Sequence, residues 1–194
     1  MLTRIILIEL ANCTYFYDLQ LHNNLFHGVI PPEFGQLGNL KKLHLFNNSL
    51  VGSIPQEIGN LSLLEELGLY NNNLSGRIPA SIASLQHLHF LSLAENYLVG
   101  EVPAEIGMKS RLRVFDLTRN HLNGTISLHL CAGGKLTVLD LGGHLFEETY
   151  PGEVGHCPSL RRMVISNNNL SGTVLNNLTM NTGILYLDMK MNSL

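Results

Sequence analysis

Two aspartates, Asp116 and Asp140, stand at the same place in two successive copies of an internal repeat, and each lies between two large apolar residues. Two carboxylates held side by side repel each other, so a shared cation would relieve the cost of keeping both charged. We therefore predict that they contact a Lys, an Arg or an amine of a ligand. The alternative is neutralisation within the chain by Arg113 and Arg119.

Aromatic and basic side chains also occur near the L-x-L steps, on the same predicted face as the two aspartates. Phe46 and Tyr70 are likewise one repeat apart, and Phe90 lies in the next repeat, directly before its L-x-L step. Aromatic anchors dominate many interfaces, so we predict that the three rings form an apolar ligand-binding patch. Arg162 is the candidate for holding the anionic end of a ligand. A solvated edge is the alternative interpretation of Arg161 and Arg162.

The repeat runs through the whole chain without insertion or deletion. An L-x-L step precedes each Asn of its period, so both apolar residues point to one side of a short strand. Stacked coils would join these strands into a parallel sheet with one continuous core. The residues between the core leucines would line the concave, ligand-binding face. The periodic asparagines are Asn24, Asn48, Asn72, Asn96, Asn120, Asn168 and Asn192.

This pattern is a leucine-rich repeat. It predicts a right-handed solenoid of the α/β class, with about eight short parallel strands and an irregular or 3-10 convex side. An Asn amide both donates and accepts, so a ladder of Asn side chains should satisfy backbone groups at the turn. Glycine permits the bend that follows, and proline gives an extended return path. Because His144 breaks the ladder and Glu148 replaces a glycine, we expect distortion around 142–150.

The domain organisation follows from the same period. We expect residues 1–194 to form a single array of about eight 24-residue repeats, truncated at both ends and without caps. A net charge of −3 and the lack of a basic run argue against nucleic acid. No apolar stretch approaches the ~20 residues that span a bilayer. We therefore expect no signal peptide, no transmembrane segment and no membrane contact by this segment itself.

Catalytic chemistry finds no support in the residues. The nine histidines fall at different phases of the repeat and share no metal-binding face. Nucleophile-elbow, phosphate-loop and kinase motifs are missing. Asp116 and Asp140 would share an open, wet sheet, which cannot separate their pKa values as an acid–base pair requires. We predict no catalytic residue, no metal, no cofactor and no enzyme activity for this segment.

Cysteines and glycosylation motifs bear on the compartment. Cys131 and Cys157 lie on adjacent coils, so a disulfide is open to them, whereas Cys13 is distant. We favour buried free thiols for the cysteines. Seven Asn-x-Ser/Thr triplets indicate a secreted or cell-surface glycoprotein as the parent. The acceptors are Asn12, Asn47, Asn60, Asn73, Asn123, Asn169 and Asn177.

The sequences LVGSIP at 50–55 and LSGRIP at 74–79 resemble the plant-specific leucine-rich repeat of receptor-like kinases and receptor-like proteins. The stretches 130–143 and 155–174 resemble the HAESA/HAIKU group of peptide-hormone receptor kinases. The resemblance implies a ligand-binding segment of a receptor-like serine/threonine kinase ectodomain, at the extracellular face of the plasma membrane. It implies peptide perception and signal transduction, with a secreted peptide or protein ligand and a co-receptor kinase as partners. A kinase domain would belong to a longer parent protein.

The resemblance also implies a role for one arginine. Some members hold the carboxylate end of the peptide with an R-x-R pair on a late strand. Aligned on SLRRMVISNN, that pair falls at Arg162 and Val164, so only Arg162 matches. The alternative function is a soluble interaction or enzyme-inhibitor protein without a kinase, similar to polygalacturonase-inhibiting proteins, which share this repeat.

Overall fold

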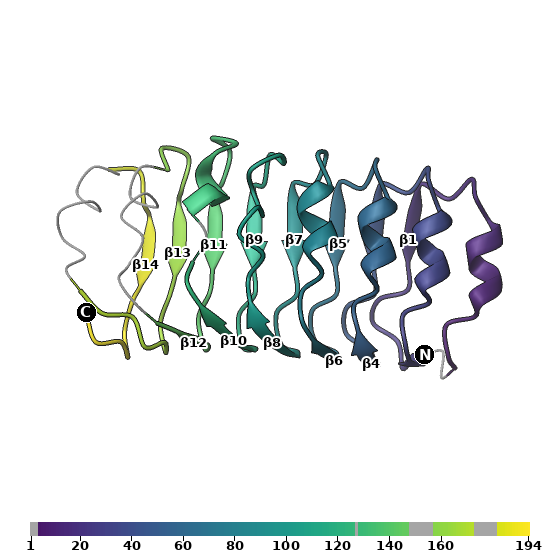
Figure 1. Ribbon diagram of the computed structural model, residues 1–194, viewed down its shortest axis with the longest axis horizontal. Helices are drawn as coiled ribbons and strands as arrows, with labels where there is room; N and C mark the ends of the chain where they lie inside the picture. Colours follow the sequence, from purple (N-terminus) through teal and green to yellow (C-terminus); the bar gives the residue numbers. More distant parts are fainter. Residues whose placement is uncertain (1–3, 127, 148–156, 173–181) are drawn as a thin grey trace.

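The computed structural model describes residues 4–126, 128–147, 157–172 and 182–194, and its coils stack along one axis (Figure 1). Within these residues eight three-residue strands form a parallel sheet, and neighbouring strands pair at a step of one repeat, as Leu43 does with Leu67. The predicted concave sheet is thereby confirmed. Its strands are β1 (Asp18–Gln20), β3 (Lys42–His44), β5 (Glu66–Gly68), β7 (Phe90–Ser92), β9 (Val114–Asp116), β11 (Val138–Asp140), β13 (Arg162–Val164) and β14 (Tyr186–Asp188).

Short 3-10 helices form the opposite, convex side. A proline at Pro31, Pro55 or Pro79 precedes three of them with an extended backbone, because its fixed φ and missing N–H end the preceding strand. No helix in the described residues has the length and apolar content needed to cross a membrane. The short convex elements confirm the predicted fold class. They are η1 (Ile8–Asn12), η2 (Pro32–Gln36), η3 (Gln56–Asn60), η4 (Ala80–Ser84) and η5 (Leu128–Cys131).

A second parallel sheet, which we did not predict from the sequence, lies beyond the Asn turn. Buried and exposed residues alternate along it, as Leu50 and Val51 do, and glycines such as Gly52 (φ 79°) bend its strands. Within the described residues it has six strands. They are β2 (His27–Gly28), β4 (Ser49–Ser53), β6 (Asn73–Gly76), β8 (Tyr97–Glu101), β10 (His121–Gly124) and β12 (Leu145–Phe146).

The core fills the space enclosed by these elements. Leu43 and Leu45 enter it from strand β3 and the residue after that strand, and Ile58 enters it from the convex helix η3; all three are fully buried in the same core. A single coil could not achieve this, because its leucines face the coils before and after it. Burial therefore depends on stacking in strict register.

The Asn ladder is present as predicted. The side-chain amide of Asn48 donates to the carbonyls of Leu21 and Leu45, both at 3.0 Å, and its oxygen accepts from the N–H of Phe26 at 3.0 Å. One side chain thus bonds to backbone groups in two coils, and the carbonyls of Leu21 and Leu45 each accept a second amide, from Asn24 and Asn72. The same three contacts recur at Asn72, Asn96, Asn120, Asn168 and Asn192.

His144 interrupts this ladder. Its ring is 5 % exposed, and neither ring nitrogen makes a hydrogen bond within the described residues. Burial lowers the pKa of His144 to about 4, although the nearby backbone of Leu117 and Asn120 opposes the shift. Strand β12, next to it, keeps the sheet register but has only two residues. Strand β2 is equally short, so the length of β12 is no sign of the distortion that we expected around 142–150; residues 148–150 lie outside the described part.

A disulfide joins Cys131 to Cys157, with Cα atoms 5.4 Å apart. Our expectation of free thiols was therefore wrong for this pair. The two residues are 26 positions apart, one coil plus two residues, and the stacking places them against each other at the end of η5. Cys13 is free and exposed, so the expectation of burial was wrong there too. A structural disulfide is typical of an oxidising compartment.

Replacing an asparagine of the ladder should destabilise the fold. Asn96→Ala would leave the N–H of Leu74 without its partner, and it would remove one of the two amide donors to each of the carbonyls of Leu69 and Leu93. We expect the free energy of unfolding to fall by about 3 kcal/mol or more, measured by urea denaturation. Asn73→Ala, at an exposed position of β6, should change it by less than about 0.5 kcal/mol. Equal effects of the two substitutions would contradict the ladder's role.

Because His144 is buried in the Asn ladder, we expect the stability of the fold to depend on pH. The folded-state pKa of about 4 lies below the ordinary value of 6.5, so the unfolded chain takes up the proton first as the pH falls. Stability is therefore complete above about pH 6.5 and is lost progressively towards about pH 4. His144→Asn removes this loss and restores the ladder contacts. It should stabilise the fold by about 1–3 kcal/mol, and by more at about pH 4.5 than at about pH 7.5.

Thermal or urea unfolding at the two pH values measures this difference. His27→Asn, at an exposed position of β2, is the matched control and should shift stability by less than about 0.5 kcal/mol at either pH. A gain for His144→Asn that stayed constant with pH would show that the buried imidazole is not responsible for the pH dependence.

Candidate ligand-binding face

The residue that lies between the two core positions of each concave strand points away from the core, because side chains alternate along a strand. Residues of equal phase on neighbouring strands are direct partners, so a row of side chains crosses the sheet at a step of one coil. This row contains Gln20, His44, Gly68, Ser92, Asp116, Asp140, Val164 and Asp188. Every predicted ligand contact lies in this row or close beside it.

Three rings stack along one side of the row. Phe46 lies flat against Tyr70, with centroids 4.3 Å apart and planes 10° apart, and His22 covers its other face at 4.2 Å and 18°. We call His22, Phe46 and Tyr70 the aromatic column. Phe90 joins it through His44, whose ring meets it edge-on at 6.2 Å. The predicted rings are thus gathered on one face, although each is half-buried because the rings cover one another.

Gly68 forms the floor between these rings. A Cβ atom at this position would lie 3.2 Å from His44, 3.3 Å from Phe46 and 3.7 Å from Phe90. The missing side chain therefore allows three rings from neighbouring coils to converge over β5. Gly68 itself is buried beneath these rings.

Charged pairs border the aromatic column on the same sheet. Glu66 lies 2.8 Å from the amine of Lys42 and 3.2 Å from Nε2 of His44. Burial lowers the pKa of His44, and the charge of Glu66 opposes that shift only in part. Two further ion pairs join residues one repeat apart: Lys41 lies 2.9 Å from Glu65, and Arg119 lies 2.8 Å from Glu95.

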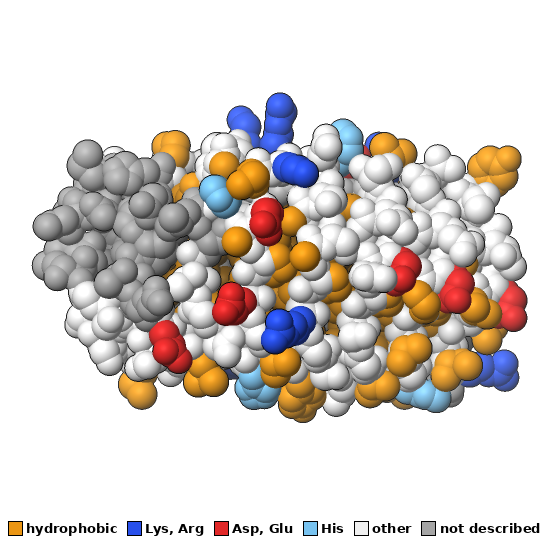
Figure 2. All heavy atoms as spheres, viewed as in Figure 1, with side chains coloured by type: hydrophobic (Ala, Val, Ile, Leu, Met, Phe, Trp, Pro, Cys, Tyr) orange, Lys and Arg blue, Asp and Glu red, His pale blue; other side chains and the backbone are white. Residues whose placement is uncertain are grey.

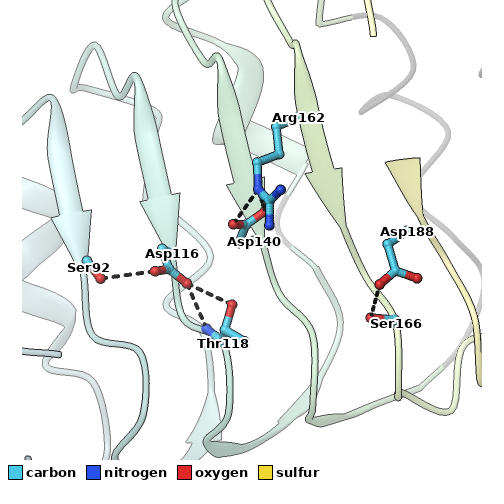
Figure 3. A network of polar contacts seen from close by, with 7 residues as sticks. All are labelled: Ser92, Asp116, Thr118, Asp140, Arg162, Ser166 and Asp188. Carbon is cyan, nitrogen blue, oxygen red and sulfur yellow. Dashed lines mark hydrogen bonds and ion pairs between the residues drawn. The ribbon is translucent and has the colours of Figure 1, made fainter. Parts of the chain in front are cut away.

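Asp116 and Asp140 are partner residues of β9 and β11, as the sequence indicated. Figure 3 shows how Asp116 is held: Ser92 donates its hydroxyl at 3.2 Å, and Thr118 donates its N–H at 3.0 Å and its hydroxyl at 2.8 Å. These neutral donors stabilise the carboxylate without cancelling its charge. Asp116 therefore presents a negative charge to the concave face.

Asp140, unlike Asp116, is paired with a positively charged side chain. Arg162 reaches over from β13, and its Nε donates to both carboxylate oxygens at 3.1 and 2.9 Å (Figure 3). Burial raises the pKa of Asp140, while Arg162 opposes the shift. The guanidinium also lies 4.5 Å from the ring centroid of Tyr186, a cation–π contact. Arg162 is thus engaged at the face where we predicted a site for an anionic group.

The alternative interpretation of the two aspartates was wrong in its choice of partners. Arg119 pairs with Glu95, and Arg113 takes part in no ion pair within the described residues. The repeat explains this outcome, because Arg119 and Glu95 share one phase and are direct neighbours on adjacent coils. The side chain that neutralises Asp140 instead comes diagonally from the next strand, 22 residues away.

The aromatic and acidic parts belong to one surface. Burial raises the pKa of Tyr70, and the charge of Asp116 raises it further, although the two residues lie on coils that are not adjacent. The repeat pattern predicted both residues on this face but gave no role to His22, Thr118 or Tyr186. The signal for His22 was available, because it shares the phase of Phe46 and Tyr70.

Most glycosylation acceptors lie on the surface, as a glycan requires. Asn47 is different: it is half-buried, its amide donates to Asn23 at 2.6 Å, and its oxygen accepts from Asn71 at 2.9 Å. A glycan there would disturb a second, shorter run of Asn contacts. Asn177 lies outside the described residues. The exposed acceptors are Asn12, Asn60, Asn73, Asn123 and Asn169.

Removing the guanidinium should change the titration of Asp140. In Arg162→Ala, burial would act unopposed, so we expect the pKa of Asp140 to rise further above its ordinary value. NMR titration of the side-chain carboxyl carbons measures this shift. Arg161→Ala is the control, because Arg161 donates to the backbone carbonyls of Pro158 and Leu160 and should leave the pKa unchanged. The same pKa in both variants would contradict the pairing.

The described residues form a solenoid with an open concave face. This architecture is typical of repeat proteins that use the concave surface for binding. A sequence profile described as Leucine Rich Repeat matches residues 17–37, 39–61 and 63–85. No curated protein has a significant match to the chain. The chain belongs to the leucine-rich-repeat family, and its fold is that of plant receptor kinase ectodomains.

Three solved structures illustrate the similarity. The plant peptide hormone receptor RGFR1 in complex with RGF2 superposes with a TM-score of 0.93 at 30 % identity, covering 98 % of this chain and 30 % of that one. The HAESA ectodomain of Arabidopsis, in complex with an N-terminal extended IDA peptide hormone ligand, gives a TM-score of 0.82 at 31 % identity, covering 98 % of this chain and 36 % of that one. The BIR3–SERK2 complex of Arabidopsis thaliana gives 0.57 at 30 %, covering 80 % and 69 %. The chain spans about a third of the two hormone receptors.

Proposed function

We propose that this chain is the ligand-binding segment of the ectodomain of a cell-surface receptor-like serine/threonine kinase, and that its concave face binds an extended secreted peptide. One observation carries the proposal: the aromatic column, the floor at Gly68 and the charge of Asp116 are contiguous on an open sheet. The hormone-bound structures of RGFR1 and HAESA, each matched over 98 % of this chain, support it.

The surface specifies the chemistry of the peptide. Its apolar residue would pack on Phe46, Tyr70 and Phe90, where half-buried rings offer area at low entropic cost. Its backbone would pass over the small residues Gly68 and Ser92. A Lys, an Arg or an amine would then meet Asp116, whose charge is hydrogen-bonded but not neutralised. Asp140 would contribute less, because Arg162 already pairs with it.

Arg162 can still receive an anionic end. Only its Nε is used for Asp140 within the described residues, and a guanidinium carries five N–H donors in all. The side chain is 43 % exposed, so its terminal nitrogens are open to a carboxylate. This arrangement supports the role in peptide-carboxylate recognition that the sequence resemblance implied for Arg162 alone.

We further propose that the parent protein lies at the plasma membrane with this face outside the cell, carries a kinase domain and recruits a co-receptor kinase. HAESA is a receptor kinase whose ectodomain was solved with its hormone, and the PEPR1–AtPEP1 complex gives a TM-score of 0.79 over 98 % of this chain. The disulfide and the exposed Asn-x-Ser/Thr acceptors support an extracellular location.

Selection from a displayed random-peptide library with the full chain as bait tests this proposal. We expect binders that combine an apolar residue with a Lys or Arg. Tyr70→Ala should weaken the best binder by about tenfold or more, since an aromatic anchor contributes more than about 1–2 kcal/mol. Tyr97→Ala is the matched control, because Tyr97 is an exposed tyrosine of β8 in the second sheet.

Several results would contradict the proposal. A library that yields no binder, or binders indifferent to Phe46→Ala, Tyr70→Ala and Asp116→Asn, would show that this face does not hold a peptide. Loss of binding with Tyr97→Ala alone would move the site to the second sheet. Failure with peptides, together with a folded protein captured on the concave face, would favour the soluble interaction or inhibitor protein over the receptor.

A further inference from the structure

The arginines and lysines of this chain differ in whether they are paired. Lys41, Lys42, Arg119, Arg162 and Lys190 each lie within ion-pair distance of a carboxylate. Four others that take part in no ion pair within the described residues line one hollow of about 500 Å³. We call this surface the basic edge. Its lining consists of Lys109, Arg111, Arg113 and Lys135, together with Gln86, His87 and His89.

The basic edge lies where the chain enters the concave strands β7, β9 and β11. Figure 2 shows Lys and Arg side chains projecting there from one long edge of the molecule. His87, Arg111 and Lys135 share one phase of the repeat, so they follow one another at a step of one coil, about 4.8 Å. The repeat thus turns three separate residues into a regularly spaced row of hydrogen-bond donors.

The backbone under this row is closely packed. A Cβ atom at Gly133 would come within 2.7 Å of the carbonyl oxygen of Ser110 and 3.2 Å of the Cα of Arg111. Thr137 donates its hydroxyl to the carbonyl of Arg113 at 2.9 Å. The loop that carries Lys135 is therefore held against the loop that carries Arg111 and Arg113, and the spacing of their charges is set by the fold.

Such a row is unfavourable on its own. Like charges on adjacent coils repel one another, and the lining of the hollow contributes no carboxylate. An acidic contact occurs at its border, where His89 lies 4.0 Å from Glu65. The whole chain has a net charge of −3, so the basic edge is a local feature and not a consequence of a basic protein. An anionic ligand would relieve the repulsion.

The composition of the lining favours one kind of anion. Protein partners usually bury an apolar or aromatic centre, and the seven lining residues include no aliphatic side chain and no Phe, Tyr or Trp. A single small anion would use one or two of the cations and leave the others facing each other. A linear polymer that carries a carboxylate on each sugar ring can instead meet one cation per coil.

We propose that the basic edge binds a linear acidic polysaccharide, a polyuronate, through its carboxylates. Arg111 and Arg113 offer planar guanidinium forks that match carboxylates in two parallel hydrogen bonds, and Lys109 and Lys135 add point charges at either side. Gln86 offers hydrogen bonds to ring hydroxyls. The site is separate from the concave face, so it holds whether or not that face binds a peptide.

The test uses the full chain and a fluorescently labelled polygalacturonate oligomer, with affinity measured by fluorescence anisotropy over a range of salt concentrations. The wild type should bind, and its affinity should fall as the salt concentration rises, because binding releases counterions. The double substitution Arg111→Ala with Lys135→Ala should weaken binding by about tenfold or more and flatten the salt dependence. Arg77→Ala is the control; it removes an exposed arginine outside the hollow and should change affinity by less than about twofold.

Two further probes decide the class of ligand. Dextran, which is neutral, should not bind, and poly-glutamate of equal charge should bind at least about tenfold more weakly, because its charges lie on flexible side chains and not on a stiff ring backbone. Equal or tighter binding of poly-glutamate would overturn the assignment in favour of an acidic protein segment. Absence of polygalacturonate binding, or equal affinity of the double variant and Arg77→Ala, would overturn the site. Unchanged circular dichroism and melting temperature confirm that each variant is folded.

Discussion

The turn at the buried asparagine is the constraint on which the rest of this molecule depends. A chain that leaves a sheet inside a protein must give hydrogen-bond partners to the backbone groups it frees, and no water is available there to provide them. The Asn amide does so for two coils at once, as Asn96 does for Leu69, Leu74 and Leu93. Each coil must therefore meet its neighbour at one height, which holds the repeat at a constant length.

A strict period converts sequence spacing into contact. Residues one repeat apart become neighbours at one strand spacing, so a column of rings forms from His22, Phe46 and Tyr70. The same rule places like charges together, and the protein handles this in two ways. On the concave face, hydroxyl groups hold Asp116 and Arg162 pairs with Asp140. At the basic edge the lining of the hollow provides no carboxylate as counter-charge.

The coil around His144 shows what happens when the rule is broken. The imidazole occupies the place of an Asn without making its hydrogen bonds, and burial depresses its pKa. The disulfide between Cys131 and Cys157 closes this same coil. Closing a loop of 26 residues stabilises a fold by roughly 3 kcal/mol in the chain-entropy view, similar to the contribution of a few hydrogen bonds. A covalent link is thus present where the ladder is missing.

The sequence by itself determined the features that depend on the period alone. The L-x-L steps placed the eight concave strands, and the periodic asparagines placed the ladder, because both are repeated local patterns. Equal phase likewise identified Phe46 with Tyr70 and Asp116 with Asp140 as neighbours. These inferences needed only the period of the repeat and the alternation of side chains along a strand.

The tertiary structure alone decided contacts between residues of unequal phase. The second sheet depends on hydrogen bonds between coils. Its strands are only two to five residues long, and such short segments carry no recognisable strand pattern in their sequence. Cys131 met Cys157, and Arg162 met Asp140, because the coils lie close enough for side chains to reach diagonally across them. Several partners were open to each of these residues along the chain. The packing of the coils left only one of these partners within contact distance. The partner of each residue is therefore decided by the folded structure.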